Sequence, residues 1–177
     1  MIKEIKIFTT FLILITSFSG CTLENDIIGK ISAKNVQQFT QQFIVGGQPS
    51  ENDLVILSKR GIKTVINLRG DGEFNDFNEK AKVEALGMNY ISIPIAGASG
   101  INNENLNLFS KAIENQEQAF IHCASGNRVG AMFALDAHFN HHKSLEEAIT
   151  VGKKSGLTRL ESTVRKVINN KKKKYEK

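Results

Sequence analysis

Short apolar runs alternate with amphipathic segments along most of this 177-residue chain. Four runs rich in β-branched or aromatic residues are typical of buried strands, and each ends at glycine, proline or a polar loop. These predicted strands cover residues 43–45, 64–68, 90–95 and 119–122. Pro94 places the third strand at a sheet edge or a strand end, because proline has no N–H to donate to a neighbouring strand.

The segments between these strands have apolar residues at helical spacing. Helices are predicted from about residues 50, 77 and 103, then from 128 to about 142, with two short helices after 144 and 158. Three capping-box patterns support helix starts: Ser50 with Asp53, Ser144 with Glu147, and Thr158 with Glu161. Strands that alternate with such helices predict an α/β fold, with a central, mainly parallel sheet flanked by helices on both faces.

The first twenty residues have the pattern of an export signal. A short basic region precedes an apolar run over residues 7–18, which is too brief to span a bilayer as a helix. The sequence Phe18-Ser19-Gly20-Cys21 resembles the bacterial lipoprotein processing site, which implies that Cys21 becomes the lipidated first residue. Plain secretion, with Cys21 an ordinary thiol, is the alternative.

This pattern divides the chain into four parts: a signal peptide over 1–20, a lipidated tether over 21–41, a folded domain over 42–168 and a basic tail over 169–177. The expected location is therefore the cell envelope, with the protein anchored to a bacterial membrane on its exported side.

The formal net charge is +5, and +4 once the signal peptide is removed. Much of this excess lies in a terminal lysine run, Lys171 to Lys174 with Lys177. Such a run is typical of a solvated tail, and the single aromatic residue within it, Tyr175, does not make the repeated aromatic interleaving that base stacking requires. The sequence therefore predicts a membrane as a partner, through the lipid anchor, and no nucleic acid.

The chemistry is concentrated in the segment Phe120 to Ala131. An apolar strand leads to Cys123 in a short glycine-containing loop, and Arg128 opens an amphipathic segment. A helix N-terminus binds anions and favours an ionised thiol, while an arginine can bind two oxygens of one anion. With Cys21 acylated, Cys123 would be the one free thiol, so a nucleophilic cysteine acting on an anionic substrate is predicted. A buried structural cysteine is the alternative.

A second loop is expected to face the same pocket. Residues 69–73 follow a predicted strand, and loops at the carboxyl ends of parallel strands share one edge of a sheet. Arg69 is therefore a candidate second cation beside the anion, or else an arginine of a surface turn. His138 and His142 have a possible metal spacing but lack an accompanying carboxylate, so no metal or other cofactor is predicted.

Four motifs resemble those of the bacterial dual-specificity-phosphatase-like domains, including the domains found with beta-lactamase-like hydrolases and with NAD kinase. They are Gly46 to Ser50, Thr64 to Arg69, Ile93 to Ile95 and His122 to Arg128, within a resemblance that covers about 36–168. The resemblance implies a cysteine-phosphatase-like fold and a phosphocysteine mechanism acting on a phosphorylated protein or small molecule. In it Cys123 attacks phosphorus, Arg128 holds oxygens, and His122 supports the thiolate. The loop amides of Ala124, Ser125, Gly126, Asn127 and Arg128 would bind the phosphate.

The chain departs from that pattern in three ways. Four residues separate Cys123 from Arg128, whereas well-studied tyrosine and dual-specificity phosphatases have five. A spacing of four resembles the loop of rhodanese sulfurtransferases. Val129 replaces a Ser or Thr whose hydroxyl helps the thiolate leave, and residues 96–100 contain no carboxylate to act as general acid. Asp71, or Glu73, is the expected replacement acid. A sulfurtransferase and a catalytically weak anion-binding module therefore stand as alternatives to a phosphatase.

Overall fold

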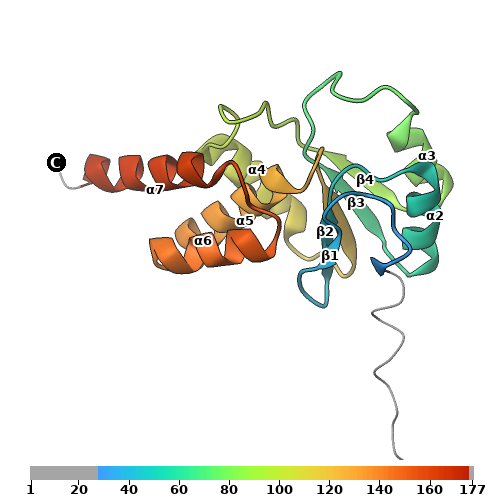
Figure 1. The fold of residues 1–177 in the computed structure, drawn as a ribbon, viewed down its shortest axis with the longest axis horizontal. Coiled ribbons are helices and arrows are strands. Elements are labelled where there is room, and N and C mark those ends of the chain that lie inside the picture. Colours follow the sequence, from blue (N-terminus) through green and yellow to red (C-terminus); the bar gives the residue numbers. More distant parts are fainter. Residues whose placement is uncertain (1–27, 176–177) are drawn as a thin grey trace, which may run out of the picture.

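A computed structural model describes residues 28–175, with side chains to residue 170. The strands are β1 (Gln37–Gln38), β2 (Phe43–Gly46), β3 (Thr64–Asn67), β4 (Asn89–Ser92) and β5 (Ala119–His122). The helices are α2 (Glu51–Lys59), α3 (Glu79–Ala85), α4 (Asn103–Ile113), α5 (Asn127–Phe139), α6 (Leu145–Lys154) and α7 (Glu161–Tyr175). Helices cover both faces of one central sheet (Figure 1).

The sheet has the order β1-β2-β5-β3-β4, and all neighbouring pairs are parallel except β1 with β2. This confirms the predicted α/β class. Strand β4 lies at an edge, as Pro94 indicates, but it ends earlier than predicted. After Ser92 one more bond joins Ile93 N–H to the Asn67 carbonyl at 2.9 Å, and Pro94 then offers no donor.

The alternation of side chains along the strands divides the core into two parts. Val45, Ile66 and Ile121 belong to a large cluster with residues of α4, α5, α6 and α7. Their strand neighbours Ile44 and Val65 face the opposite way, into a smaller cluster that includes residues of α2 and α3. Figure 1 shows α2 and α3 on one side of the sheet and α4 to α7 on the other. Each face therefore buries one half of the period-two pattern.

Two of the three predicted capping boxes form. The Ser50 and Ser144 side chains each accept from the backbone three residues on, and Asp53 and Glu147 bind back. The third prediction is wrong, because α7 begins at Glu161, whose carboxylate binds Arg165 and Lys153 instead.

The folded region begins earlier than residue 42. Ile31 is buried in the smaller core cluster, and Ser32 donates from its N–H and its hydroxyl to Asp53, at 2.7 and 2.8 Å. Strand β1 adds an antiparallel pair to β2. Residues 31–38 of the predicted tether are therefore part of the domain, because their apolar side chains and backbone groups find partners on it.

The predicted tail likewise differs, since α7 continues as a helix through residues 169–175. The signal peptide and Cys21 lie outside the described residues. Between residues 28 and 175, no helix is both long enough and apolar enough to cross a bilayer.

Candidate active site around Cys123

Cys123 follows the carboxyl end of β5, at the centre of the sheet. It is 1% exposed and free, and its N–H points to the Gly46 carbonyl at 3.4 Å. The chain then turns through Gly126, which has φ of 85°, and α5 starts at the next residue. Within residues 28–170 no side chain caps this helix start, so its first amides are available to an anion beside the sulfur.

The outer side of the Cys123 loop is held by the segment before α2. The Asn35 side-chain amide donates to the Ser125 carbonyl at 2.9 Å, and the Gln48 N–H points to the Ala124 carbonyl at 3.4 Å. In a trans peptide the N–H points opposite to the carbonyl. The Ser125 N–H therefore points away from Gln48, as a loop that binds anions through its amides requires.

The guanidinium of Arg128 is fixed by groups from three loops. Nη1 donates to the carbonyl oxygens of Leu68 and Ile95 at 3.3 and 2.7 Å, which ties the arginine to the ends of β3 and β4. The two terminal nitrogens, Nη1 and Nη2, also donate to the two carboxylate oxygens of Glu73, at 2.7 and 2.5 Å. Arg128 is thus held in position to bind a planar or tetrahedral anion through two nitrogens, and Glu73 occupies that position.

This pair sets the charges of the site. Hydrogen bonds from Arg128 lower the pKa of Glu73, so its carboxylate is ionised in this arrangement. Burial alone would lower the pKa of Arg128, but the bond to Glu73 and the charge of Cys123 raise it. The Arg128 side chain is 9% exposed and that of Glu73 is 35% exposed. Glu73 is therefore the partner that has room to move.

A cavity of about 270 Å³ opens over the sulfur, lined by Cys123, Ala124, Ser125, Arg128, Glu73 and Arg159 among others. The loops after β3 and β5 do meet at one pocket, as the parallel sheet predicts. Val129 lies away from this cavity, fully buried in the larger core cluster.

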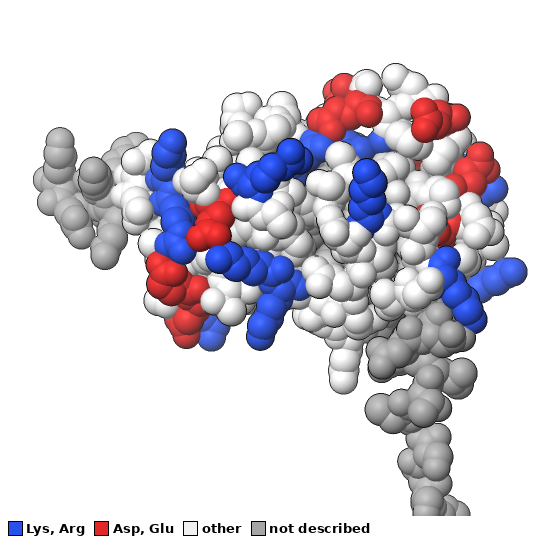
Figure 2. Space-filling model, in the orientation of Figure 1, with Lys and Arg blue, Asp and Glu red and all other residues white. Residues whose placement is uncertain are grey.

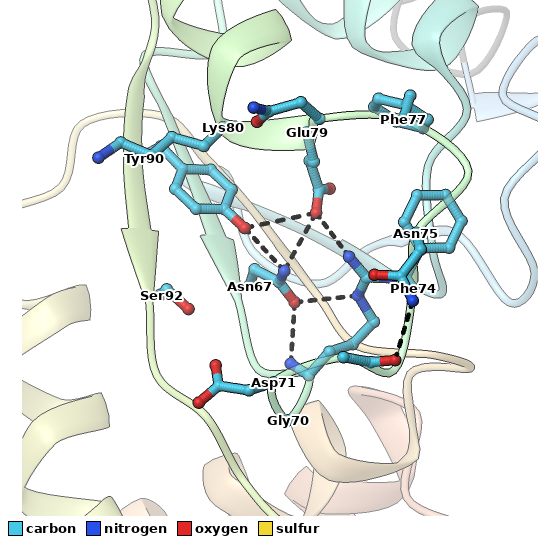
Figure 3. A pocket seen from close by; sticks show the side chains of 13 residues that line it. Asn67, Gly70, Asp71, Phe74, Asn75, Phe77, Glu79, Lys80, Tyr90 and Ser92 are labelled. Atoms are coloured by element: carbon cyan, nitrogen blue, oxygen red, sulfur yellow. Dashed lines mark hydrogen bonds and ion pairs between the residues drawn. The ribbon is translucent and has the colours of Figure 1, made fainter.

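A larger cavity, of about 410 Å³, is lined mainly by the β3–α3 loop, together with residues of β3, α3 and β4 (Figure 3). The carboxylate of Glu79 is central to its wall and is 3% exposed. Arg69 and Asn67 each donate to Glu79 Oε2 at 3.0 Å, and the Tyr90 hydroxyl lies 3.5 Å from the same oxygen. His122 Nε2 is 2.9 Å from Oε1, close enough for an ion pair although not aligned for a hydrogen bond. We call Asn67, Arg69, Glu79, Tyr90 and His122 the Glu79 cluster.

Burial alone would raise the pKa of Glu79, but His122 and the charge of Arg69 lower it overall. Burial also raises the pKa of Tyr90. The Glu79 cluster thus holds an ionised carboxylate directly behind the residue that precedes Cys123. Site residues are expected in the loops that follow strands. Glu79 is instead the first residue of α3, so the sequence gives no signal for it.

Two site predictions need correction. Arg69 does not line the Cys123 cavity, because its guanidinium binds Glu79 and lies 4.3 Å over the Phe74 ring. Asp71 lines the larger cavity, at whose rim Figure 3 shows it, and not the cavity of Cys123. The loop turns at Gly70 to Gly72, so that Glu73 is the carboxylate that reaches Arg128.

Two further site residues make contacts that the sequence does not predict. The ring of His122 is fully buried beneath the loop and stacks on Phe120 at 5.5 Å. The Asn127 side-chain oxygen accepts from the backbone N–H groups of Thr158 and Leu160, at 2.8 and 3.4 Å, so it organises a neighbouring loop.

Comparison with known proteins adds a family to this geometry. A family model described as a DSP-PTPase phosphatase fused to NAD+ kinase matches residues 21–173. A beta-lactamase hydrolase-like protein of Xylella fastidiosa strain Temecula1 is 28% identical over 127 residues, covering 68% of this chain and 29% of the relative. The corresponding protein of Agrobacterium fabrum strain C58 is 32% identical over 103 residues, covering 55% and 24%. The chain thus spans under a third of the length of these relatives.

Among solved structures, a candidate phosphatase from Neisseria meningitidis Z2491 superposes with a TM-score of 0.62 at 20% identity. The match covers 75% of this chain and 95% of that one. At this identity the likeness establishes a shared fold.

Proposed function

The chain belongs to the family of dual-specificity-phosphatase-like domains described as fused to NAD+ kinase, and from this premise we propose that it hydrolyses phosphomonoesters through a phosphocysteine intermediate. One observation carries the proposal. Arg128 is held beside Cys123 with two nitrogens on the oxygens of a single anionic group, which is the contact that a phosphate would make.

In the first step the Cys123 sulfur attacks phosphorus, an S–P bond forms and the P–O bond to the leaving group breaks. Arg128 and the amides at the start of α5 bind the non-bridging oxygens. The phosphate takes over the nitrogens that Glu73 occupies in the free protein, and Glu73, which is partly exposed, moves aside.

We assign the general-acid role to Glu73. Once the phosphate has replaced it on Arg128, its carboxylate lies near a dianion without its cationic partner, and both changes favour uptake of a proton. That proton goes to the leaving oxygen. In the second step a water attacks phosphorus, the S–P bond breaks, and the carboxylate takes the proton of the water and so restores the starting state.

The second step is expected to be the slower one. Val129 stands where a hydroxyl would assist departure of the thiolate, and its side chain is buried in the core. The intermediate should therefore accumulate, and rapid acid quench followed by mass spectrometry should detect a phosphate mass on the peptide that contains Cys123.

The test uses the purified full chain with p-nitrophenyl phosphate and a chelator. We expect phosphate release that Cys123→Ser abolishes. Cys123 and Arg128 are separated by four residues, as in rhodaneses, so sulfur transfer is the second candidate. Thiocyanate formation from thiosulfate and cyanide, without phosphate release, would overturn the proposal in its favour. Absence of both activities, together with a melting temperature raised by phosphate, would favour a binding module.

We further propose that the protein is anchored to a bacterial membrane on the exported side of the cell envelope, through acyl chains on Cys21. The support is the lipoprotein-like processing sequence that ends at Cys21. Mass spectrometry of the protein from its own membrane fraction tests this, because an unmodified Cys21, or an uncleaved N-terminus, would contradict it.

A further inference from the structure

The segment between α6 and α7 is packed against the Cys123 loop. Gly156 has φ of 106°, and a Cβ on it would lie 2.8 Å from the Gly126 carbonyl oxygen. A Cβ on Gly130 would lie 2.0 Å from the Leu157 nitrogen, so the start of α5 and residue 157 touch backbone to backbone. Only glycine permits either approach.

The same segment is also held by hydrogen bonds from the Cys123 loop. The Asn127 side-chain oxygen accepts from the backbone N–H groups of Thr158 and Leu160, which lie on either side of Arg159. The backbone of Arg159 is therefore fixed from both directions relative to the loop that carries Cys123. This arrangement gives an exposed arginine a defined place at the mouth of the cavity.

The two arginines at this cavity differ in whether they have a binding partner. Arg128 is paired with Glu73, whereas the side chain of Arg159 has no ion pair or hydrogen bond within the part of the chain that the structure describes. Figure 2 shows acidic side chains gathered over the β3–α3 loop and basic side chains extending across the middle of the same face. A bound phosphate would satisfy Arg128 alone and leave Arg159 available for a second anionic group.

The lining and the volume of the cavity restrict the part of the ligand beyond the phosphate. None of the described residues that line it is aromatic, so among them a planar ring has nothing to stack on. Its volume of about 270 Å³ lies slightly below the range of small-molecule sites, which are usually about 300–1,000 Å³. These features favour a compact, polar and multiply charged ligand.

We propose that Arg159 determines specificity by binding a second anionic group next to the scissile phosphate. The substrate class is then a small phosphomonoester that carries a carboxylate or a second phosphate close to the reacting one. This inference rests on the proposed phosphatase function, and it specifies the substrate of that site.

Two substrates that differ at one group provide the test. Glycerol 2-phosphate and 2-phosphoglycerate are alike except that a hydroxymethyl group in the first is a carboxylate in the second. 2,3-Bisphosphoglycerate adds a second phosphate. With the full chain, phosphate release should give a higher kcat/KM for 2-phosphoglycerate than for glycerol 2-phosphate. Because the bisphosphate keeps the carboxylate, a further rise in kcat/KM with it would show that a second phosphate adds to the effect of the carboxylate.

Arg159→Ala should lower kcat/KM for 2-phosphoglycerate about tenfold, or about 1.4 kcal/mol. It should lower kcat/KM for glycerol 2-phosphate by less than about threefold, and Arg159→Lys should restore most of the preference because it keeps the charge. Lys154→Ala is the matched control, since it removes one positive charge, in the last turn of α6, that does not line the cavity. An unchanged preference in Arg159→Ala, or an equal loss in Lys154→Ala, would overturn the proposal.

Failure of the proposed function is distinguishable from failure of this inference. If the wild-type chain hydrolyses p-nitrophenyl phosphate but none of the three compounds, the proposed substrate class fails while the phosphatase proposal stands. If it hydrolyses neither p-nitrophenyl phosphate nor the three compounds, the phosphatase proposal fails, and binding of the three compounds is measured by calorimetry. Tighter binding of 2-phosphoglycerate than of glycerol 2-phosphate, lost in Arg159→Ala, would still support the second anion site. Equal binding of both compounds by the wild type would overturn it.

Discussion

Replacement of Glu79 by glutamine removes the one negative charge of a buried cluster that also contains Arg69 and His122. The carboxylate is 3% exposed, and the Arg69 side chain is 7% exposed. Glutamine keeps one oxygen for Arg69 but presents an N–H₂ group to its other neighbours, which are mainly donors. A buried guanidinium is then left without its counter-charge.

The magnitude follows from that burial. Removal of one partner from a buried ion pair costs about 3–5 kcal/mol, and the oxygen that glutamine retains favours the lower end, about 3 kcal/mol. For a domain of this size each kcal/mol shifts the melting temperature by about 2–4 °C, so Glu79→Gln should melt about 6–12 °C lower at pH 7.

Glu84→Gln is the matched control because it makes the same change on the same helix. Glu84 is exposed and lies 3.9 Å from Lys80, and such a surface pair contributes below about 1 kcal/mol. Thermal unfolding followed by circular dichroism compares the two variants. If Glu79→Gln melts within about 2 °C of Glu84→Gln, the buried ion pair of the Glu79 cluster does not stabilise the fold.

Three other predictions concern pH, packing and the acid. The pKa of Glu79 is lowered in the folded state, so its contribution is full above the usual carboxyl pKa and is lost as the pH falls through the folded value. The difference in melting temperature between wild type and Glu79→Gln should therefore shrink below about pH 4, and a constant difference would contradict the assignment. Gly130→Ala places a Cβ 2.0 Å from the Leu157 nitrogen and should cost about 3 kcal/mol by urea unfolding; near-wild-type stability would show that α6 and α7 shift freely. Glu73→Gln should bind inorganic phosphate about fivefold more tightly by calorimetry, because the competing charge on Arg128 is gone, yet should lower kcat about 10²-fold. Asp71→Asn is its control and should change neither quantity. The reverse pattern would assign the general-acid role to Asp71.

The sheet and its site loop could be predicted because their signals are local. Short, continuous apolar runs mark β2, β3 and β5, and helices lie between these runs in the sequence. The parallel arrangement follows from those helices. That arrangement brings the loops after β3 and β5 to one edge. The position of Cys123 before a helix start follows from the same reasoning.

The choice of partner within those loops could not be predicted. Asp71 and Glu73 are two residues apart in a turn, and only the position of Arg128 determines which carboxylate is bound. The sequence predicts Arg69 near the anion, but the buried carboxylate of Glu79 on α3 binds its guanidinium instead. Arg159 lies 31 residues beyond Arg128, in the segment between α6 and α7. That segment approaches the Cys123 loop through contacts between backbones, which no sequence pattern marks.

The bond from Asn35 to the Ser125 carbonyl has a practical consequence for handling the protein. A shortened version that begins at residue 42, where the pattern of strands alone would place its first element, lacks this support and also the serine that binds Asp53. Such a fragment could fold and still return poor turnover, which would be misread as a property of the enzyme. Recombinant versions for assay or crystallisation should therefore retain every residue from Ile28 onward.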